Sequence, residues 1–163
     1  MKRCAGILLD GLLLFSSNPL SINGAAAQDI PKPKSTVVYV AEQQNVPAGK
    51  QSLVELHFRV VDGYHVNSHT PKSDFLIPTE LTVQPAVGVI QSAAVYSAGH
   101  DFSFSFSPTE KLDVYSGDFT VKLPVVADAG THMMDASLRY QACDRAACYP
   151  PKLLPLQVLF TAR

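Results

Sequence analysis

Charge of either sign is scarce in this chain, and the two signs nearly cancel. Only 17% of the 163 residues are charged, and 13 basic against 14 acidic residues leave a formal net charge of −1. This balance provides no basic field for nucleic acid or for an anionic membrane surface. The low charged fraction excludes a long solvated helix, and 47% hydrophobic residues are too many for a disordered chain. We therefore expect one packed core and no nucleic-acid partner.

The first 27 residues carry the three parts of a secretory signal peptide. Residues 1–3 are basic, residues 7–15 are mostly Leu and Ile, and Ala25-Ala26-Ala27 forms a small-residue cleavage site. A membrane anchor is disfavoured, because the apolar run is too short to span about 30 Å of hydrocarbon and contains Asp10. We expect export with cleavage after Ala27.

Cleavage would divide the chain into a signal peptide at 1–27, a flexible segment rich in Pro and Lys at 28–35, and a folded domain at 36–163. The mature chain is not expected to insert stably into a membrane. Of the three cysteines, only Cys143 and Cys148 would remain. Two thiols this close can form a disulfide in an oxidising compartment.

Sustained helical periodicity and internal repeats are absent, and short strand-like segments take their place. Strands are predicted where β-branched and aromatic residues mostly alternate with polar ones. These segments are residues 36–40, 52–61, 80–83, 88–90, 102–106, 119–123, 136–140 and 154–160. Turn signals with Gly or Pro separate most of them at intervals of about ten residues. The spacing predicts an all-β fold, an immunoglobulin-like antiparallel β-sandwich.

The cysteine pair encloses four residues that are predicted to form a turn between two strands. Cys143 and Cys148 would then lie opposite each other, about 4.5 to 5.5 Å apart at Cα, where a disulfide can form. A bridge across about six residues stabilises a fold by only roughly 2 kcal/mol, so a redox-active bridge and a local staple both stay open. No helix end is expected nearby, and Asp144 offsets Arg145, which favours a thiol of near-ordinary pKa.

Four stretches of the domain resemble a known family. They are residues 62–71, 74–79, 114–117 and 140–151, and the last contains both cysteines followed by Tyr-Pro-Pro. These stretches are similar to the N-terminal periplasmic domain of the thiol:disulfide interchange protein DsbD, and the likeness extends over nearly all of residues 36–161. The cysteine stretch is the specific one, whereas the others mostly identify the fold.

The resemblance implies an immunoglobulin-like protein-disulfide reductase component of the periplasm. Such a domain takes reducing equivalents from a membrane-embedded thiol reductant and passes them to thioredoxin-like periplasmic proteins. Cys148 would exchange with partners and Cys143 would resolve the mixed disulfide, with no cofactor beyond this couple. The best-known member has one more residue between its cysteines, and it carries a transmembrane domain and a thioredoxin-like domain on the same chain. Because this chain ends at Arg163, the donor is expected on a separate chain.

The same resemblance implies an aromatic cap over the disulfide. Phe104 or Phe106 is the expected cap, within residues 102–106. The alternative is that the alternating Phe residues form the inner face of a strand.

Further residues are expected next to the cysteines by this resemblance. Tyr64, His65 and Asn67 fall where the family brings polar and aromatic groups near its disulfide, and Tyr149 follows Cys148 directly. For Tyr64 and His65 the alternative is an exposed pair at the end of a strand.

Two other classes of function stay open. His132-Met133-Met134 and the thiols are soft ligands for copper, although a blue-copper site has a His soon after its Cys. Zinc is disfavoured because a closed site needs four ligands and only the two cysteines have an obvious spacing. In the favoured interpretation, a redox pair, no metal is expected. A passive interaction module with a stapled hairpin is the second class, its sheet edge protected by Pro150 and Pro151. A hydrolase is excluded because no Ser or Cys lies in a nucleophile elbow.

Overall fold

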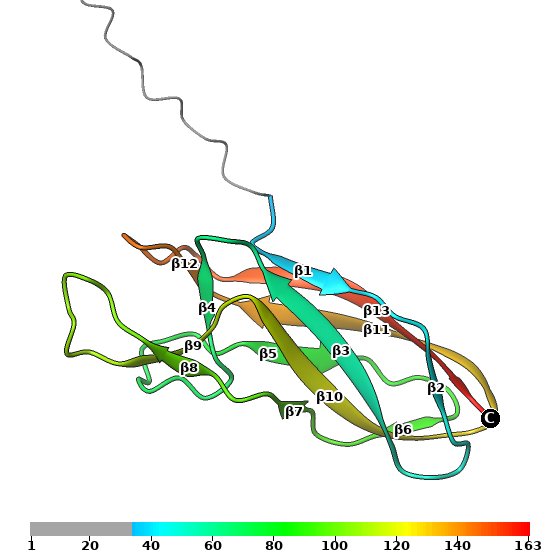
Figure 1. Cartoon of the computed structure of the whole chain (residues 1–163). Helices are drawn as coiled ribbons and strands as arrows, with labels where there is room; N and C mark the ends of the chain where they lie inside the picture. Colours follow the sequence, from blue (N-terminus) through cyan, green and yellow to red (C-terminus); the bar gives the residue numbers. More distant parts are fainter. Residues whose placement is uncertain (1–33) are drawn as a thin grey trace, which may run out of the picture. The chain divides into compact units, whose positions relative to one another are not determined.

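The computed structural model describes residues 34–163, which form two main β-sheets and a third, smaller sheet (Figure 1). The predicted signal peptide and most of segment 28–35 lie outside these residues. Of that segment the structure describes Lys34 and Ser35, and the Ser35 hydroxyl donates a hydrogen bond to the Val37 carbonyl (2.6 Å). Among the described residues no helix is long and apolar enough to cross a membrane.

The thirteen strands of residues 34–163 are distributed over the three sheets as follows. The first sheet has the order β1-β3-β10-β6, with β7 also paired to β10, and consists of β1 (Val37–Val40), β3 (Ser52–Val60), β6 (Val89–Gln91), β7 (Val95–Tyr96) and β10 (Asp118–Ala127). The second has the order β2-β13-β11-β5 and consists of β2 (Gln44–Val46), β5 (Glu80–Val83), β11 (Gly130–Tyr140) and β13 (Lys152–Ala162). The third has the order β12-β4-β9-β8 and consists of β4 (His65–Asn67), β8 (His100–Phe102), β9 (Leu112–Tyr115) and β12 (Ala142–Cys143).

The core lies between the two main sheets, because every second side chain of their long strands is apolar. In β3, Leu56 and Phe58 are buried, and in β13, Val158 and Phe160 are buried, with more exposed residues between them. This is the alternation that a half-buried strand requires. Each such side chain contributes about 1.5–3 kcal/mol through burial. The predicted all-β, immunoglobulin-like sandwich is confirmed, although β2 pairs with β13 in parallel.

The strand predicted at 102–106 is wrong. Only Phe102 belongs to a strand, and residues 103–106 begin the loop between β8 and β9. The ladder between these strands ends at Phe102↔Leu112. Beyond it the backbone turns on itself, with the Ser107 N–H donating to the Phe104 carbonyl at 3.0 Å. The alternating Phe residues therefore do not form the inner face of a strand.

Most of the third sheet was not predicted from the sequence. Three of its strands have two or three residues, too few to show a period of two. They form because partners from distant parts of the chain meet there, as in the pairing of β4 with both β9 and β12.

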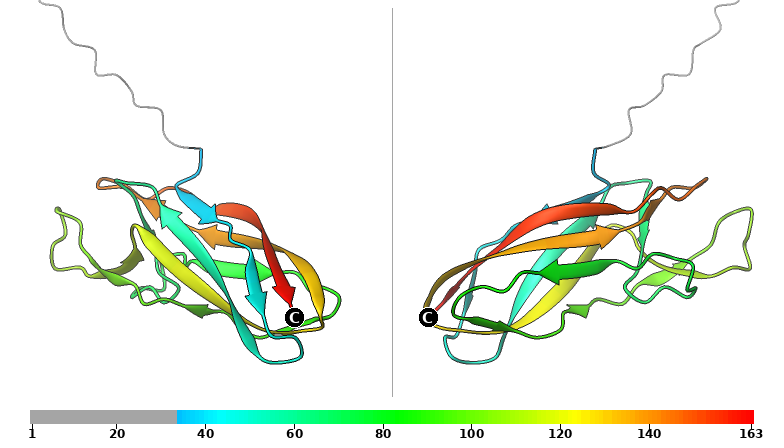
Figure 2. Two further views of the ribbon diagram at one scale, coloured as in Figure 1. Left: turned by 45° about the vertical axis from the view of Figure 1, so that its right-hand side comes forward. Right: turned by 180° about the vertical axis from the view of Figure 1, so that it is seen from behind.

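Two connections place the third sheet at one end of the sandwich. After β3, Gly63 adopts a φ of +84°, a left-handed conformation that suits glycine, and the chain turns into β4. After β11, residues 141–151 leave the second sheet and return where Tyr140 pairs with Lys152. The excursion contains the turn with both cysteines. Figure 2 shows this turn and the β8–β9 loop at the same end of the sandwich.

Candidate redox site

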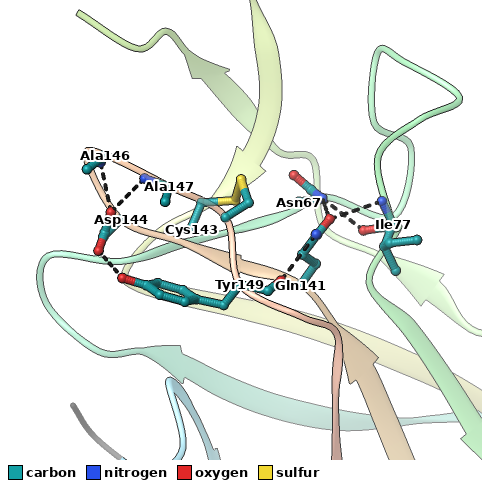
Figure 3. The surroundings of a disulfide bond; sticks show 9 residues. Asn67, Ile77, Gln141, Cys143, Asp144, Ala146, Ala147 and Tyr149 are labelled. Atoms are coloured by element: carbon teal, nitrogen blue, oxygen red, sulfur yellow. Dashed lines mark hydrogen bonds between the residues drawn. A yellow bond between two sulfur atoms is a disulfide. The ribbon is translucent and has the colours of Figure 1, made fainter.

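Asp144 folds the segment between the cysteines into a closed turn. Its Oδ1 accepts hydrogen bonds from the backbone N–H groups of Ala146 (2.7 Å) and Ala147 (2.9 Å), as Figure 3 shows. Its own N–H donates to the Ala147 carbonyl at 2.9 Å. An Asp that bonds the backbone two residues ahead is a common turn former, so this role could have been found in the sequence.

The closed turn brings Cys143 and Cys148 into opposed positions, where they form a disulfide with an S–S distance of 2.03 Å. Their Cα atoms are 3.9 Å apart, closer than the predicted 4.5 to 5.5 Å. The expected distance assumed a regular ladder on both sides, whereas Cys148 meets Cys143 only in an isolated bridge.

The two sulfur-bearing residues differ in their access to solvent. Cys143 lies in β12 with no exposed surface, and Cys148 is exposed. A partner can therefore reach the side of Cys148, while Cys143 is covered by the protein. Attack on a disulfide depends on which sulfur is accessible.

Tyr149 ties the turn to the strands behind it. Its hydroxyl donates a hydrogen bond to Asp144 Oδ2, and its backbone N–H donates to the Ala142 carbonyl at 2.8 Å. The Gln141 side chain donates to the Tyr149 carbonyl at 3.2 Å. Tyr64 is half-buried, with its ring centroid 6.2 Å from that of Tyr149. Both tyrosines thus lie near the cysteine turn.

Hydrogen bonds between the side-chain amides of Asn67 and Gln141 connect the turn to neighbouring segments. Asn67 Nδ2 donates to Gln141 Oε1 at 3.1 Å and to the Ile77 carbonyl at 3.0 Å (Figure 3). Asn67 is fully buried. Gln141 was not among the predicted site residues, because no neighbouring residue in the sequence indicates that its side chain bonds Asn67, Ile77 and Tyr149.

His65 faces the buried cysteine. In the antiparallel pair of β4 and β12, His65 is the direct register partner of Cys143. Only 4% of its surface is exposed, so the alternative of an exposed His at a strand end is wrong. Its Nε2 is buried and has no hydrogen-bond partner among the described residues. Burial, and less strongly the nearby His100, lower the pKa of His65, whereas the Asp144 carboxylate raises it.

Aromatic rings from the end of β8 and from the β8–β9 loop cover His65. The ring centroids of Phe102 and Phe104 lie 4.0 and 5.8 Å from that of His65. Phe106 stacks on Phe104 at 4.9 Å but is 70% exposed. A hollow of about 200 Å³ is lined by residues 102–105 together with Arg145 of the turn. Phe102 was not among the residues expected as the cap.

The candidate copper ligands do not meet the cysteines. His132 Nε2 donates a hydrogen bond to the Asp128 carbonyl (2.8 Å), Met133 is 58% exposed and Met134 is buried. Met134 and Tyr140 are separated along β11 by about 20 Å at the usual rise per residue. Among residues 34–163 no group of three or more His, Cys, Asp or Glu side chains could hold a metal ion.

Comparison with known proteins gives matches over most of the chain. The family model described as "Thiol:disulfide interchange protein DsbD, N-terminal" matches residues 31–154. The thiol:disulfide interchange protein DsbD of Actinobacillus pleuropneumoniae serotype 5b (strain L20) is 26% identical over 160 residues, which cover 97% of this chain. The chain corresponds to 24% of that relative's length.

Two solved structures from Neisseria meningitidis are similar. The structure of the complex between the DsbD N-terminal and PilB N-terminal domains matches at 21% identity and a TM-score of 0.51, over 80% of this chain and 88% of the matched chain. The DsbD N-terminal domain in the reduced form matches at 21% identity and a TM-score of 0.46, over 71% and 86%. The first of these agrees with the observed fold. Because the family model covers most of the folded domain, the chain belongs to the family of N-terminal domains of the thiol:disulfide interchange protein DsbD.

Proposed function

We propose that this chain exchanges thiols and disulfides with thioredoxin-like proteins through Cys143 and Cys148. The observation that carries the proposal is the asymmetry of the pair: an exposed sulfur for the partner beside a buried one that only its neighbour can reach. A disulfide that only stabilises the fold does not require one of its cysteines to be more exposed than the other. A bridge this short also contributes only roughly 2 kcal/mol to stability, so stability alone is a weak reason for it.

The exchange proceeds in two substitutions at sulfur. The Cys148 thiolate attacks the disulfide of the partner, whose second sulfur leaves as a thiolate. Cys143 then attacks the Cys148 sulfur, a disulfide forms between the two cysteines, and the partner's first sulfur leaves as a thiolate. Two electrons pass from the cysteine pair to the partner, and no cofactor beyond the pair takes part. The chain acts as a protein-disulfide reductase component.

The chain is proposed to work in the periplasm after removal of residues 1–27, with residues 36–163 as the exchange domain. Membership of the DsbD N-terminal family supports this location. The Neisseria meningitidis domain forms a complex with the PilB N-terminal domain, which supports a protein partner for this chain as well. The donor that reduces the Cys143–Cys148 bridge is proposed to be a membrane-embedded thiol protein.

The reduction potential of the Cys143–Cys148 couple tests the proposal. Equilibration of the folded domain with thiol–disulfide buffers, read by mass after thiol alkylation, should give a value between about −270 and −120 mV, the range of exchange proteins. A value below about −300 mV is that of a structural disulfide. It would instead support a passive module with a stapled hairpin.

Removing one of the rings that pack on His65 should expose the site. Phe102→Ala and Phe104→Ala each delete ring contacts with His65 and with each other. A ring pair contributes about 0.5–1.5 kcal/mol, so reduction of the bridge by dithiothreitol should become roughly 2- to 10-fold faster. Phe75→Ala is the matched control, because Phe75 is 96% exposed. Equal rates in all three variants and the original protein would rule out a cap.

A further inference from the structure

We infer that His65 accepts the thiol proton of Cys143 when this buried sulfur attacks the mixed disulfide on Cys148. The inference rests on the proposed function, in which Cys143 performs the second substitution. A thiol must lose its proton to become a nucleophile, and a thiol buried among apolar groups resists ionisation. Water cannot readily take this proton from Cys143, which has no exposed surface. The protein therefore needs a base beside it.

Strand register places His65 in that position. His65 and Cys143 are direct partners in the antiparallel ladder between β4 and β12. Side chains of such a pair lie on the same face of the sheet, with Cβ atoms about 4.5–5.5 Å apart. Each belongs to a short strand held by further pairs, Ala142↔Val66 beside them and Val66↔Tyr115 on the other edge of β4. The two side chains are thus kept together by backbone pairing.

The surroundings of His65 leave it free to act as a base. Phe102 and Phe104 pack against its ring, and its buried Nε2 has no hydrogen-bond partner among the described residues. The charged and titratable groups that act on it are Asp144 from the cysteine turn and His100 from β8. Arg145 lines the hollow beside Phe102. Since burial lowers the pKa of His65 below its ordinary value of 6.5, the imidazole is neutral at pH 7.

The proton and electrons balance in this step. The Cys143 S–H bond breaks, its proton goes to His65, and its electron pair forms the bond to Cys148 Sγ. The bond between Cys148 Sγ and the partner sulfur breaks, and the partner leaves as a thiolate. The imidazolium, stabilised by Asp144, then releases its proton to that thiolate or to solvent. Cys143 and Cys148 are oxidised, and the partner is reduced.

The test separates the two sulfur attacks with a small disulfide. The reduced domain is mixed in a stopped-flow instrument with excess 5,5′-dithiobis(2-nitrobenzoate), which releases one coloured thiolate when Cys148 attacks and a second when Cys143 closes the bridge. The variants are His65→Gln and His65→Phe, the latter retaining an aromatic ring against Phe102. Both should leave the first release unchanged and slow the second by about 100-fold at pH 7, the lower range of general-base catalysis.

The pH profile distinguishes a base from a space-filling side chain. In the original protein the second release should be nearly independent of pH once His65 is neutral. In both variants it should rise about tenfold per pH unit, because hydroxide must then ionise the thiol, and it should approach the original rate at high pH. His132→Gln, which changes a half-buried His at the other end of β11, should behave as the original protein in both phases.

Two results would overturn the role of His65. In the first, the second thiolate is released from His65→Phe at the original rate at every pH, which would show that His65 only fills space. The second is an equal slowing of both releases in the two variants, which would show that His65 only maintains the shape of the turn. These readouts use a small disulfide, so they remain informative if the reduction potential or partner exchange refutes the proposed function. In that case the two releases still occur and still report on His65.

Discussion

Cys143→Ala should trap a covalent complex with a thioredoxin-like partner, whereas Cys148→Ala should trap none. With Cys143 removed, Cys148 is still exposed and still attacks the partner's disulfide, but no sulfur remains to release the product. With Cys148 removed, the remaining thiol is buried and out of the partner's reach. The measurement is non-reducing electrophoresis and mass spectrometry after mixing each reduced variant with an oxidised thioredoxin-like protein. Turnover should be lost in both.

Cys143→Ala and Cys148→Ala are controls for each other. Each lacks the bridge, so each loses the same contribution to stability, roughly 2 kcal/mol. A difference in trapping therefore reports on the position of the remaining sulfur and not on weakened folding. Equal trapping by both variants would contradict the assignment of Cys148 as the exchanging residue. If neither variant traps a partner that the original protein does reduce, the assignment is contradicted as well.

Gly99→Ala should lower the free energy of unfolding by about 3 kcal/mol, the upper range for an overpacked site. A Cβ at this position would lie 2.9 Å from the Ser68 Cβ and 2.9 Å from the Asp113 Cγ, closer than side chains tolerate. The Ser68 Cβ cannot simply withdraw, because it is attached to backbone whose N–H donates to the Asp113 carbonyl at 3.0 Å. Urea denaturation of the oxidised domain measures the change.

The same substitution should also open the redox site. Gly99 immediately precedes β8, which ends in Phe102, so moving β8 away from β9 shifts the ring that packs on His65. Reduction by dithiothreitol should then be faster than in the original domain. Gly49→Ala is the control: Gly49 has a φ of +67° but nothing within 4 Å of a new Cβ. It should cost about 1 kcal/mol through backbone strain and leave the reduction rate unchanged. Original stability in Gly99→Ala would contradict the packing argument.

The long strands were predictable because their signal is local. In β3, β10, β11 and β13 the apolar residues recur at every second position, and burial follows this pattern. The same alternation led to a wrong prediction at residues 102–106, where three Phe residues alternate with Ser. Alternation indicates a strand only if a neighbouring strand continues the ladder, and here β9 begins at Leu112, the partner of Phe102, so residues 103–106 have no strand beside them in this ladder. The local sequence pattern could not show that no strand pairs with these residues in that ladder.

At the cysteine pair, too, the sequence predicted some features of the site and not others. Its spacing and the Tyr-Pro-Pro that follows indicated both the disulfide and the family. Spacing did not reveal which sulfur is exposed, since burial of Cys143 comes from β4, nearly eighty residues earlier in the chain. His65 was expected near the cysteines, but its burial and its register opposite Cys143 follow from that same pairing.

The amino-acid order alone determined the all-β class, the four long strands, the turn with its two thiols and the family, since each is encoded in residues close together along the chain. Tertiary structure decided the unequal exposure of the thiols, the rings over His65 and the space at Gly99. These depend on contacts between β4, β8, β9 and β12, whose short segments carry almost no local signal. They are stabilised only when the larger sheets bring them together.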